Sequence, residues 1–247
     1  MKRAVLFDLD GTLVGLKPYG RLAVLQRALS HFGVSGITQD QADRFWYSAE
    51  RYTMLKKWSI QAEEFWPRLD STELLYLQMQ HTFCYRDVKI VSYLAGRGLE
   101  LGLVSNSAHV SILGKLELLR PHFQPSSLRQ VVSCSEDTPL PKPHPHGILY
   151  ALAKLEVAPH EVLMVGDSMD DVRAAHAAGV EVAIVNRGAP IQFDSAYSYH
   201  RLNSLWELKT LFASELATSG YRHSSGKLVG YYPKNRPEII LGEELAS

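Results

Sequence analysis

Two aspartates two residues apart, Asp8 and Asp10, follow the apolar run 4–7 near the start of the chain. The run predicts a short buried strand, and side chains two residues apart on a strand leave on the same face. Both carboxylates should therefore lie at the carboxyl end of that strand, where open parallel sheets place ligands. Two negative charges that close repel each other unless a cation lies between them or one carboxylate holds a proton. The pair predicts a site for a hard metal ion, or a nucleophile beside an acid/base.

Further polar groups follow predicted strands or precede predicted helices elsewhere in the chain: Ser105, Asn106, Lys142, Asp167, Asp170 and Asp171. The first two end the apolar stretch 99–104, and Asp167 comes after the stretch 162–165. Lys142 stands in a loop that four prolines stiffen between positions 139 and 145. Because the carboxyl ends of parallel strands meet at one edge of a sheet, we expect these groups to gather there.

Together these residue types predict a site for phosphate transfer. Asp8 is placed to attack phosphorus and form an aspartyl-phosphate. Asp10 is placed to protonate the leaving oxygen and then to activate water against the phospho-enzyme. Mg²⁺ prefers carboxylate and carbonyl oxygens, so Asp167, Asp8 and the carbonyl of Asp10 are the expected protein ligands of a magnesium ion.

A second group of residues is expected to bind the phosphate. Lys142 and the Ser105 hydroxyl would hold its oxygens by charge and by hydrogen bonding. Backbone N–H groups in the loop at Gly11 and Thr12, and at Asn106, would add donors aimed at the same oxygens.

Each of these signals has an ordinary structural explanation when it stands alone. A D-x-D-G match is more often a solvated turn, and it is not a calcium-binding EF-hand because Gly11 stands at the fourth loop position instead of the sixth. Ser105 alone would be a helix cap, and Asp170 or Asp171 alone would be an acid favoured by a helix N-terminus. Their joint occurrence, in order and at strand ends, favours the functional interpretation. Which of Asp170 and Asp171 approaches the metal stays open, with Asp170 the weaker candidate.

The elements that must position these residues fall into two kinds. Between about 19 and 82 the apolar residues recur at helical spacing and predict four helices with no strand among them: 19–33, from 38, from 59 or 61 to 69, and from 71. Six aromatic side chains in this block are expected to form its interior, with a platform for the substrate as the alternative: Phe45, Trp46, Tyr47, Trp58, Phe65 and Trp66.

From about residue 86 strands alternate with helices, which predicts a doubly wound parallel sheet. Beyond the first strand, the expected strands are 99–104, 130–134, 162–165 and 182–185, with a short edge strand at 197–200. The expected organisation is a Rossmann-like α/β core formed by residues 1–15 and 86–216, an inserted helical domain formed by 16–85, and a C-terminal extension, 217–247. The extension is rich in Gly, Pro and Tyr and does not fit the alternation.

The composition of the chain indicates which kinds of molecule it binds. The chain has 247 residues with 26 Lys+Arg and 26 Asp+Glu, so no net field draws it to nucleic acid or to an anionic membrane. No apolar stretch reaches the roughly 18 residues of a membrane helix, and Asp8 and Asp10 interrupt what would otherwise resemble a signal peptide. Two cysteines are too few for a disulfide framework, so we expect reduced thiols in a cytoplasmic protein. The expected partner is a small phosphorylated metabolite, and the oligomeric state is open.

Four motifs also carry a resemblance to a known family: D-L-D-G-T at 8–12, V-S-N at 104–106, K-P at 142–143 and G-D-S-x-x-D at 166–171. In order and strand context they resemble the four motifs of the haloacid dehalogenase superfamily, and its phosphoglycolate phosphatase-like group in particular. The resemblance covers residues 1–15 and 86–200. It implies a Rossmann-like core, a nucleophile at Asp8 and an acid/base at Asp10.

The same resemblance assigns the remaining positions. It implies that Ser105 and Lys142 bind phosphate, that Asp167 binds Mg²⁺ directly, and that Asp171 is a second acidic partner of the metal. The inserted helical block is similar to the cap that these enzymes carry after the first motif. Many relatives have an aspartate where this chain has Gly15, so the resemblance transfers the catalytic set and not a substrate.

Two other functions fit the sequence. Dehalogenases of this superfamily typically lack the second aspartate and phosphonate hydrolases carry a small residue there, whereas phosphomutases keep both aspartates and so remain an alternative. A regulatory protein that binds a phosphorylated ligand with little turnover is the other alternative, prompted by the unusual segment 217–247. The substrate itself would be selected by the inserted helices, which carry no recognisable motif.

Overall fold

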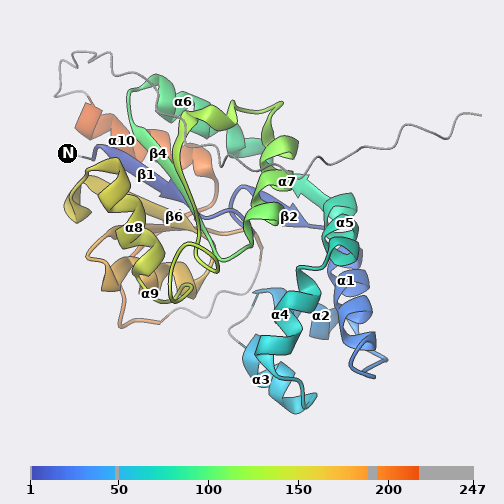
Figure 1. The fold of residues 1–247 in the computed structure, drawn as a ribbon. Coiled ribbons are helices and arrows are strands. Elements are labelled where there is room, and N and C mark those ends of the chain that lie inside the picture. The colour runs from blue at the N-terminus through green and yellow to red at the C-terminus, as the bar shows by residue number, and fades with distance from the viewer. Residues whose placement is uncertain (1, 48–49, 189–193, 217–247) are drawn as a thin grey trace, which may run out of the picture.

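The computed structural model describes residues 2–47, 50–188 and 194–216 (Figure 1). Its core is a six-stranded parallel sheet with the strand order β5-β4-β1-β6-β7-β8. The strands are β1 (Ala4–Phe7), β4 (Glu100–Ser105), β5 (Leu128–Ser133), β6 (Val162–Gly166), β7 (Glu181–Val185) and β8 (His200–Leu202). This confirms the predicted Rossmann-like α/β fold.

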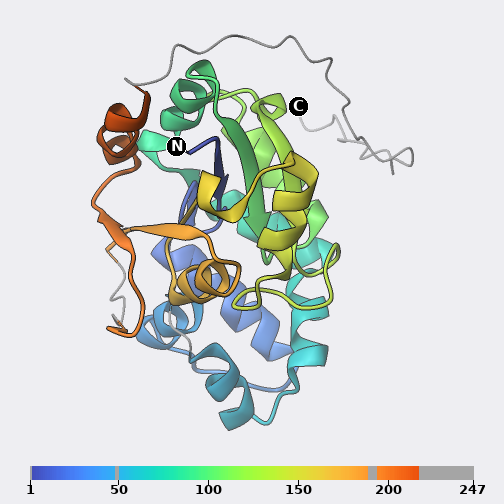
Figure 2. The ribbon, with the colours of Figure 1, turned by 90° about the vertical axis from the view of Figure 1, so that its left-hand side faces the viewer.

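Helices cover both faces of the sheet. Alternate side chains of β1 point to opposite faces, and all of them are buried under these helices. Val5 and Phe7 belong to the apolar core on one face, and Ala4 and Leu6 belong to the core on the other. The first face packs against α6 (Ile90–Gly96), α7 (His109–Leu119) and α10 (Leu208–Leu216), and the second against α8 (His146–Leu155) and α9 (Met169–Ala177) (Figures 1 and 2).

The strand order places the end of β1 at a special point. From β1 the chain first builds outward through β4 and β5, and it then returns to add β6, β7 and β8 on the other side. Ligands of doubly wound sheets bind at the carboxyl edge, at the point where the direction reverses. In this sheet that point lies between the ends of β1 and β6, where the Asp8 N–H donates a 2.8 Å hydrogen bond to the Val165 carbonyl.

The inserted helical block lies between residues 18 and 81 and projects beyond the sheet (Figure 1). Its helices are α1 (Pro18–Ser30), α2 (Gln39–Tyr47), α3 (Arg51–Lys57), α4 (Ala62–Leu69) and α5 (Thr72–His81). Phe45 and Phe65 are buried at its centre, with ring centroids 5.3 Å apart, and Trp46, Trp58 and Trp66 pack around them. The predicted aromatic interior is therefore confirmed for these five side chains, whereas the segment from residue 38 forms two helices instead of one.

A two-stranded antiparallel ribbon joins the block to the core. It consists of β2 (Val14–Leu16) and β3 (Thr82–Cys84), so the chain enters and leaves the block through paired strands. Neither strand was predicted from the sequence, because three-residue strands are too short to show an alternating pattern. The pairing places the connection directly after the Asp8–Asp10 loop.

The remaining predictions concern the C-terminal part of the chain, the two cysteines and the absence of membrane helices. The edge strand is β8 (His200–Leu202), which begins where the predicted strand 197–200 ends. The C-terminal extension, 217–247, lies outside the described residues. Cys84 and Cys134 are both free thiols. Within the described ranges, no helix combines the length and the apolar character needed to cross a bilayer.

Arg187, just after β7, fastens the ribbon and the first loop to the core. Its guanidinium donates two hydrogen bonds to the Asp87 carboxylate, each 2.9 Å long, and one of 2.7 Å to the Thr12 carbonyl. The guanidinium also lies over the Tyr85 ring, 3.9 Å from its centroid. The network therefore fixes the loop that contains Thr12 to the residues that follow β3.

The Asp87 carboxyl has a lowered pKa in this setting. Burial alone would raise its pKa, but the Arg187 hydrogen bonds and a backbone N–H from Leu205 lower the pKa below its usual value. Its charged form is thus the form that stabilises the fold.

Replacing Arg187 with Met keeps an apolar stem but leaves the Asp87 carboxylate buried with only the Ser204 hydroxyl and the Leu205 N–H as donors. We expect the free energy of unfolding at pH 7, measured by urea denaturation, to fall by about 3 kcal/mol, because the variant leaves the buried Asp87 carboxylate without a charged partner. The matched control is Arg129→Met, which removes a surface pair with Glu100 and should cost less than about 1 kcal/mol.

The pH dependence of this difference follows from the lowered pKa of Asp87. The stabilisation is complete above the unfolded-state pKa and is lost as the pH falls through the lower folded-state pKa. The difference between wild type and Arg187→Met should therefore be constant from about pH 5 to pH 7 and shrink below about pH 4. A difference that grows on acidification would contradict this assignment.

Candidate active site

Lys142 lies at the centre of the candidate site. Its ammonium donates hydrogen bonds of 2.7 Å to one oxygen of Asp8 and of 2.7 Å to one oxygen of Asp171, and a third of 2.8 Å to the Val104 carbonyl. The side chains of Lys142, Asp8 and Asp171 are each less than a tenth exposed. Three segments far apart in the sequence, at β1, the proline-rich loop and α9, therefore meet at one buried charge.

Two opposing influences set the pKa values in this cluster: burial favours the neutral form of each group, and contact with an opposite charge favours the charged form. Burial, more than any other influence, raises the pKa of Asp8 to about 7, even though Lys142 lowers it. Burial and the charges of Asp8 and Asp171 also raise the pKa of Asp167 well above its usual value. Burial disfavours the charged form of Lys142, but the Asp171 and Asp8 carboxylates raise its pKa above the ordinary value. One ammonium is thus too little positive charge for three carboxylates.

Asn106 holds the Lys142 backbone in place. Its side-chain amide donates a 2.9 Å hydrogen bond to the Lys142 carbonyl and accepts one of 2.9 Å from the Lys142 N–H. Ser105, the last residue of β4, is buried, and its hydroxyl accepts a hydrogen bond from the Ser107 N–H at 3.1 Å. The sequence predicted a backbone contribution from Asn106; it did not predict that the Asn106 side chain would clasp the lysine loop.

Two glycines allow the carboxylates to approach. Gly11 has φ +84°, and a Cβ built there would lie 1.8 Å from an Asp167 carboxylate oxygen. A Cβ at Gly166 would lie 2.3 Å from the carboxyl carbon of Asp171. Only a residue without a side chain leaves room for these acids beside β1 and β6.

The carboxylates form a set that fits a hard cation. Oxygens of Asp8, Asp167 and Asp171 all lie within 4.8 Å of one another. Carboxylate oxygens are the donors that Mg²⁺ prefers, and a divalent cation would supply the positive charge that the cluster lacks. Asp170 is not part of this group and lies 3.6 Å from Arg51 at the start of α3, in an ion pair between the inserted block and the core.

The loop after Asp8 arranges backbone donors around the site in a way that the sequence only partly predicted. The Gly11 N–H donates to the Val14 carbonyl at 2.7 Å, and the Thr12 N–H to the Leu9 carbonyl at 3.3 Å, so both N–H groups serve the turn. The Thr12 hydroxyl donates to the second oxygen of Asp8 at 3.1 Å. The contribution of Gly11 and Thr12 in this structure is to shape the loop and to hold Asp8.

The backbone N–H groups of Leu9, Asp10 and Asn106 also lie at this sheet edge. Within the described part of the chain, none of the three donates a hydrogen bond to the carbonyls of the surrounding turns. Leu9 and Asp10 come next after Asp8, and Asn106 directly follows β4. They are therefore donors that could bind the oxygens of an anion.

Asp10 lies apart from the three-carboxylate cluster and is held by residues that the sequence did not single out. Its carboxylate accepts a 2.7 Å hydrogen bond from the Ser107 hydroxyl and contacts the Lys115 ammonium at 2.7 and 2.9 Å. A signal for Lys115 was present, because it falls on the buried stripe of α7 with Ile112 and Leu116, where an unpaired lysine would be costly.

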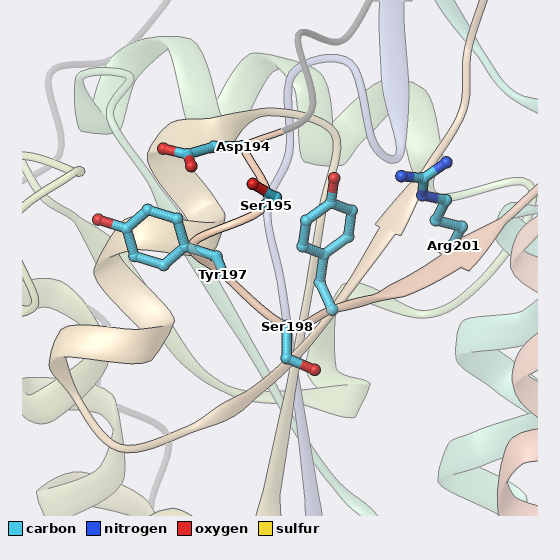
Figure 3. Close-up of a pocket in the computed structure, with 6 residues that line it drawn as sticks. Asp194, Ser195, Tyr197, Ser198 and Arg201 are labelled. Atoms are coloured by element: carbon cyan, nitrogen blue, oxygen red, sulfur yellow. The ribbon is translucent and has the colours of Figure 1, made fainter.

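A surface hollow elsewhere in the molecule does not belong to this site. Its volume is about 240 Å³, and its lining residues are Asp194, Ser195, Tyr197, Ser198, Tyr199 and Arg201 (Figure 3). These residues precede or begin β8, and His176 near the end of α9 contacts the same segment. They therefore lie toward the amino edge of the parallel sheet, opposite to Asp8.

Comparisons with known proteins agree with this geometry. Residues 5–185 match the model of the family described as haloacid dehalogenase-like hydrolase. The chain is 28% identical over 185 residues to pyrophosphatase PpaX of Bacillus pumilus (strain SAFR-032), an alignment that covers 72% of this chain and 81% of the relative. It is 30% identical over 201 residues to phosphoglycolate phosphatase of Shigella boydii serotype 4 (strain Sb227), covering 72% of this chain and 78% of the relative.

A solved structure agrees as well. A protein from Bacteroides fragilis described as haloacid dehalogenase-like superposes with a TM-score of 0.71 at 28% identity. The superposition covers 84% of this chain and all of that protein, so the likeness is not confined to one part of the fold.

The close approach of Gly11 to Asp167 yields a test with a matched control. Gly11→Ala and Gly36→Ala both place a side chain at a positive φ, but only Gly11 faces a carboxylate, whereas Gly36 has open space around it. We expect Gly36→Ala to lower the free energy of unfolding by about 1 kcal/mol and to leave Mg²⁺ binding unchanged. Gly11→Ala should cost more and should weaken Mg²⁺ binding at least about tenfold, because Asp167 must move. Urea denaturation and calorimetric titration measure the two quantities, and equal Mg²⁺ affinity in both variants would contradict the assignment.

Proposed function

Because this chain belongs to the haloacid dehalogenase-like hydrolases and is a phosphatase of that family, we propose that it hydrolyses a small phosphomonoester through an aspartyl-phosphate on Asp8, with Mg²⁺ as cofactor. One observation carries this proposal. A buried carboxylate at the end of β1 is held at both oxygens, by Lys142 and by the Thr12 hydroxyl, beside two further carboxylates. This is a fixed oxygen nucleophile at the ligand-binding edge of the sheet.

The chain's own residues would perform the reaction as follows. An oxygen of Asp8 attacks phosphorus, and the bond from phosphorus to the leaving oxygen breaks as Asp10 donates a proton to that oxygen. Water then attacks phosphorus and gives a proton to Asp10, while the bond from phosphorus to the Asp8 oxygen breaks. Phosphate is released and the Asp8 carboxylate is restored. The three N–H donors of Lys142 are used by Asp8, Asp171 and the Val104 carbonyl, so its ammonium stabilises the phosphoryl oxygens by its positive charge, and the Ser105 hydroxyl does so by hydrogen bonding.

The available backbone donors suit the same oxygens. In this proposal the N–H groups of Leu9, Asp10 and Asn106 bind the phosphoryl oxygens, while Gly11 and Thr12 shape the loop that presents them. Mg²⁺, held by Asp8, Asp167 and the Asp10 carbonyl with Asp171 as a further acidic partner, would neutralise the carboxylates and the bound phosphate.

The inserted helical block would act as the cap that selects the substrate and excludes water. Its support is the ion pair of Arg51 with Asp170, which brings the start of α3 against the start of α9. Asp170 directly precedes Asp171 of the carboxylate cluster, so this contact joins the block to the edge of the site. The names of the relatives suggest phosphoglycolate and inorganic pyrophosphate as the first compounds to test.

The two alternatives remain distinguishable by product. A phosphomutase would return an isomerised sugar phosphate, whereas a phosphatase releases inorganic phosphate and the free alcohol. A regulatory protein with little turnover would bind phosphorylated metabolites from a panel without releasing phosphate from any of them, and deletion of residues 217–247 tests whether that segment matters.

The nucleophile is tested by Asp8→Asn, which preserves shape and removes the attacking charge. With p-nitrophenyl phosphate and Mg²⁺, we expect kcat to fall by roughly 10³-fold or more, and EDTA to abolish wild-type activity until Mg²⁺ is restored. Glu100→Gln is the matched control, since this acid pairs with Arg129 at the start of β4, away from the carboxylate cluster, and its kcat should stay within about twofold of wild type. Full activity of Asp8→Asn would exclude the proposed mechanism.

A further inference from the structure

Lys115 is a buried cation that the catalytic scheme above does not use. It lies on α7, its side chain is 4% exposed, and it enters the site from the helix that follows the Ser105 loop. Its helix is held firmly, because the neighbouring Ile112, Leu116 and Leu119 are buried in the sheet's apolar core. A buried ammonium is costly unless paired, so its partner shows what the position requires.

That partner is the proposed acid/base. The Lys115 ammonium lies 2.7 Å from one oxygen of Asp10 and 2.9 Å from the other, and it also donates to the Ser107 hydroxyl at 3.3 Å. The Ser107 hydroxyl in turn donates to Asp10 at 2.7 Å. The two donors and the carboxylate thus form a closed triangle of contacts.

The geometry of the triangle is one-sided. The Asp10 side chain is 47% exposed, so its carboxylate is fixed along one edge by donors from the core while the rest of it faces solvent. Asp10 comes from the first loop, whereas Lys115 and Ser107 come from the segment after β4. Without them, the half-exposed side chain of Asp10 would be free to take several rotamers.

We propose that Lys115 and Ser107 are positioning residues, which fix the Asp10 carboxylate in the orientation from which it delivers a proton to the leaving oxygen. The inference rests on the proposed role of Asp10 as the acid/base. Proton transfer requires the acid within hydrogen-bonding distance of the leaving oxygen, so a carboxylate spread over several orientations is a poorer acid. Neither residue touches the substrate in this scheme.

The test uses two aryl esters that differ in their need for a proton. Phenyl phosphate has a poor leaving group that must be protonated, whereas 2,4-dinitrophenyl phosphate has a leaving group that departs as an anion. For Lys115→Met we expect kcat/KM for phenyl phosphate to fall by roughly 30- to 100-fold, and kcat/KM for the dinitrophenyl ester to fall by less than about threefold. Lys115→Arg, which keeps the charge, should recover part of the loss with phenyl phosphate.

Ser107→Ala keeps the test decisive even where the buried lysine cannot be replaced without unfolding. This partly buried loop position should show the same selectivity, with a loss of about three- to tenfold confined to phenyl phosphate. Lys154→Met, at an exposed lysine of α8, is the control for loss of a cation and should change neither rate. Equal losses with both esters in Lys115→Met and Ser107→Ala, or no loss in Ser107→Ala with phenyl phosphate, would overturn the inference.

Asp10→Asn separates this inference from the proposed function. If Asp10→Asn loses activity selectively with phenyl phosphate but the Lys115 and Ser107 variants do not, the acid assignment stands and the positioning role is wrong. If Asp10→Asn lowers kcat/KM, which reports only the first step, equally for both esters, Asp10 is not the acid and the proposed function itself must be revised. Circular dichroism and thermal unfolding of each variant establish that the fold is retained.

Discussion

The site depends on one interaction, the contact of the buried Lys142 ammonium with the carboxylates of Asp8 and Asp171. Asp8 directly follows β1 and Asp171 lies on α9, so the two acids are far apart in the sequence but close together in the fold. Their negative charges would repel each other in this buried setting. The rest of the local structure serves this contact. Asn106 clasps the lysine backbone on both sides, and Gly166 leaves the space that Asp171 occupies. Replacing Lys142, Asn106 or Gly166 would therefore disturb the contact between the ammonium and the two carboxylates.

That group is still short of positive charge, which is why a divalent cation fits there. Asp8, Asp167 and Asp171 lie together with a single ammonium, and burial raises the pKa of both Asp8 and Asp167. A nucleophilic aspartate must be ionised, so a pKa of about 7 is unfavourable for Asp8 without further positive charge. A divalent cation at the carboxylates lowers that pKa and gives Asp167 a partner. The electrostatics of the cluster and the chemistry of the proposed reaction would both be served by the proposed divalent cation.

Much of this could be predicted from the sequence because its signals are local. The strand before Asp8, the strand before Asp167 and the lysine in its proline-rich loop each have a short pattern, and the parallel fold brings them to one edge. What could not be predicted depends on contacts between distant residues. The β2–β3 ribbon forms by pairing segments of three residues, and the contacts of Lys115 with Asp10 and of Arg187 with Asp87 join positions about a hundred residues apart. Patterns within one window carry no information about such partners, although a lysine on an apolar helical stripe marks a place to look.

The central claim is that Asp8 carries the phosphoryl group during turnover, and trapping that intermediate tests it most directly. The protein is mixed with a phosphomonoester and Mg²⁺, quenched during turnover and treated with borohydride, which reduces an aspartyl-phosphate to homoserine. Peptide mass spectrometry then locates the change. We predict substrate-dependent homoserine at position 8 and at no other aspartate. Steady release of phosphate with position 8 unmodified, or modification at a different residue, would contradict the claim.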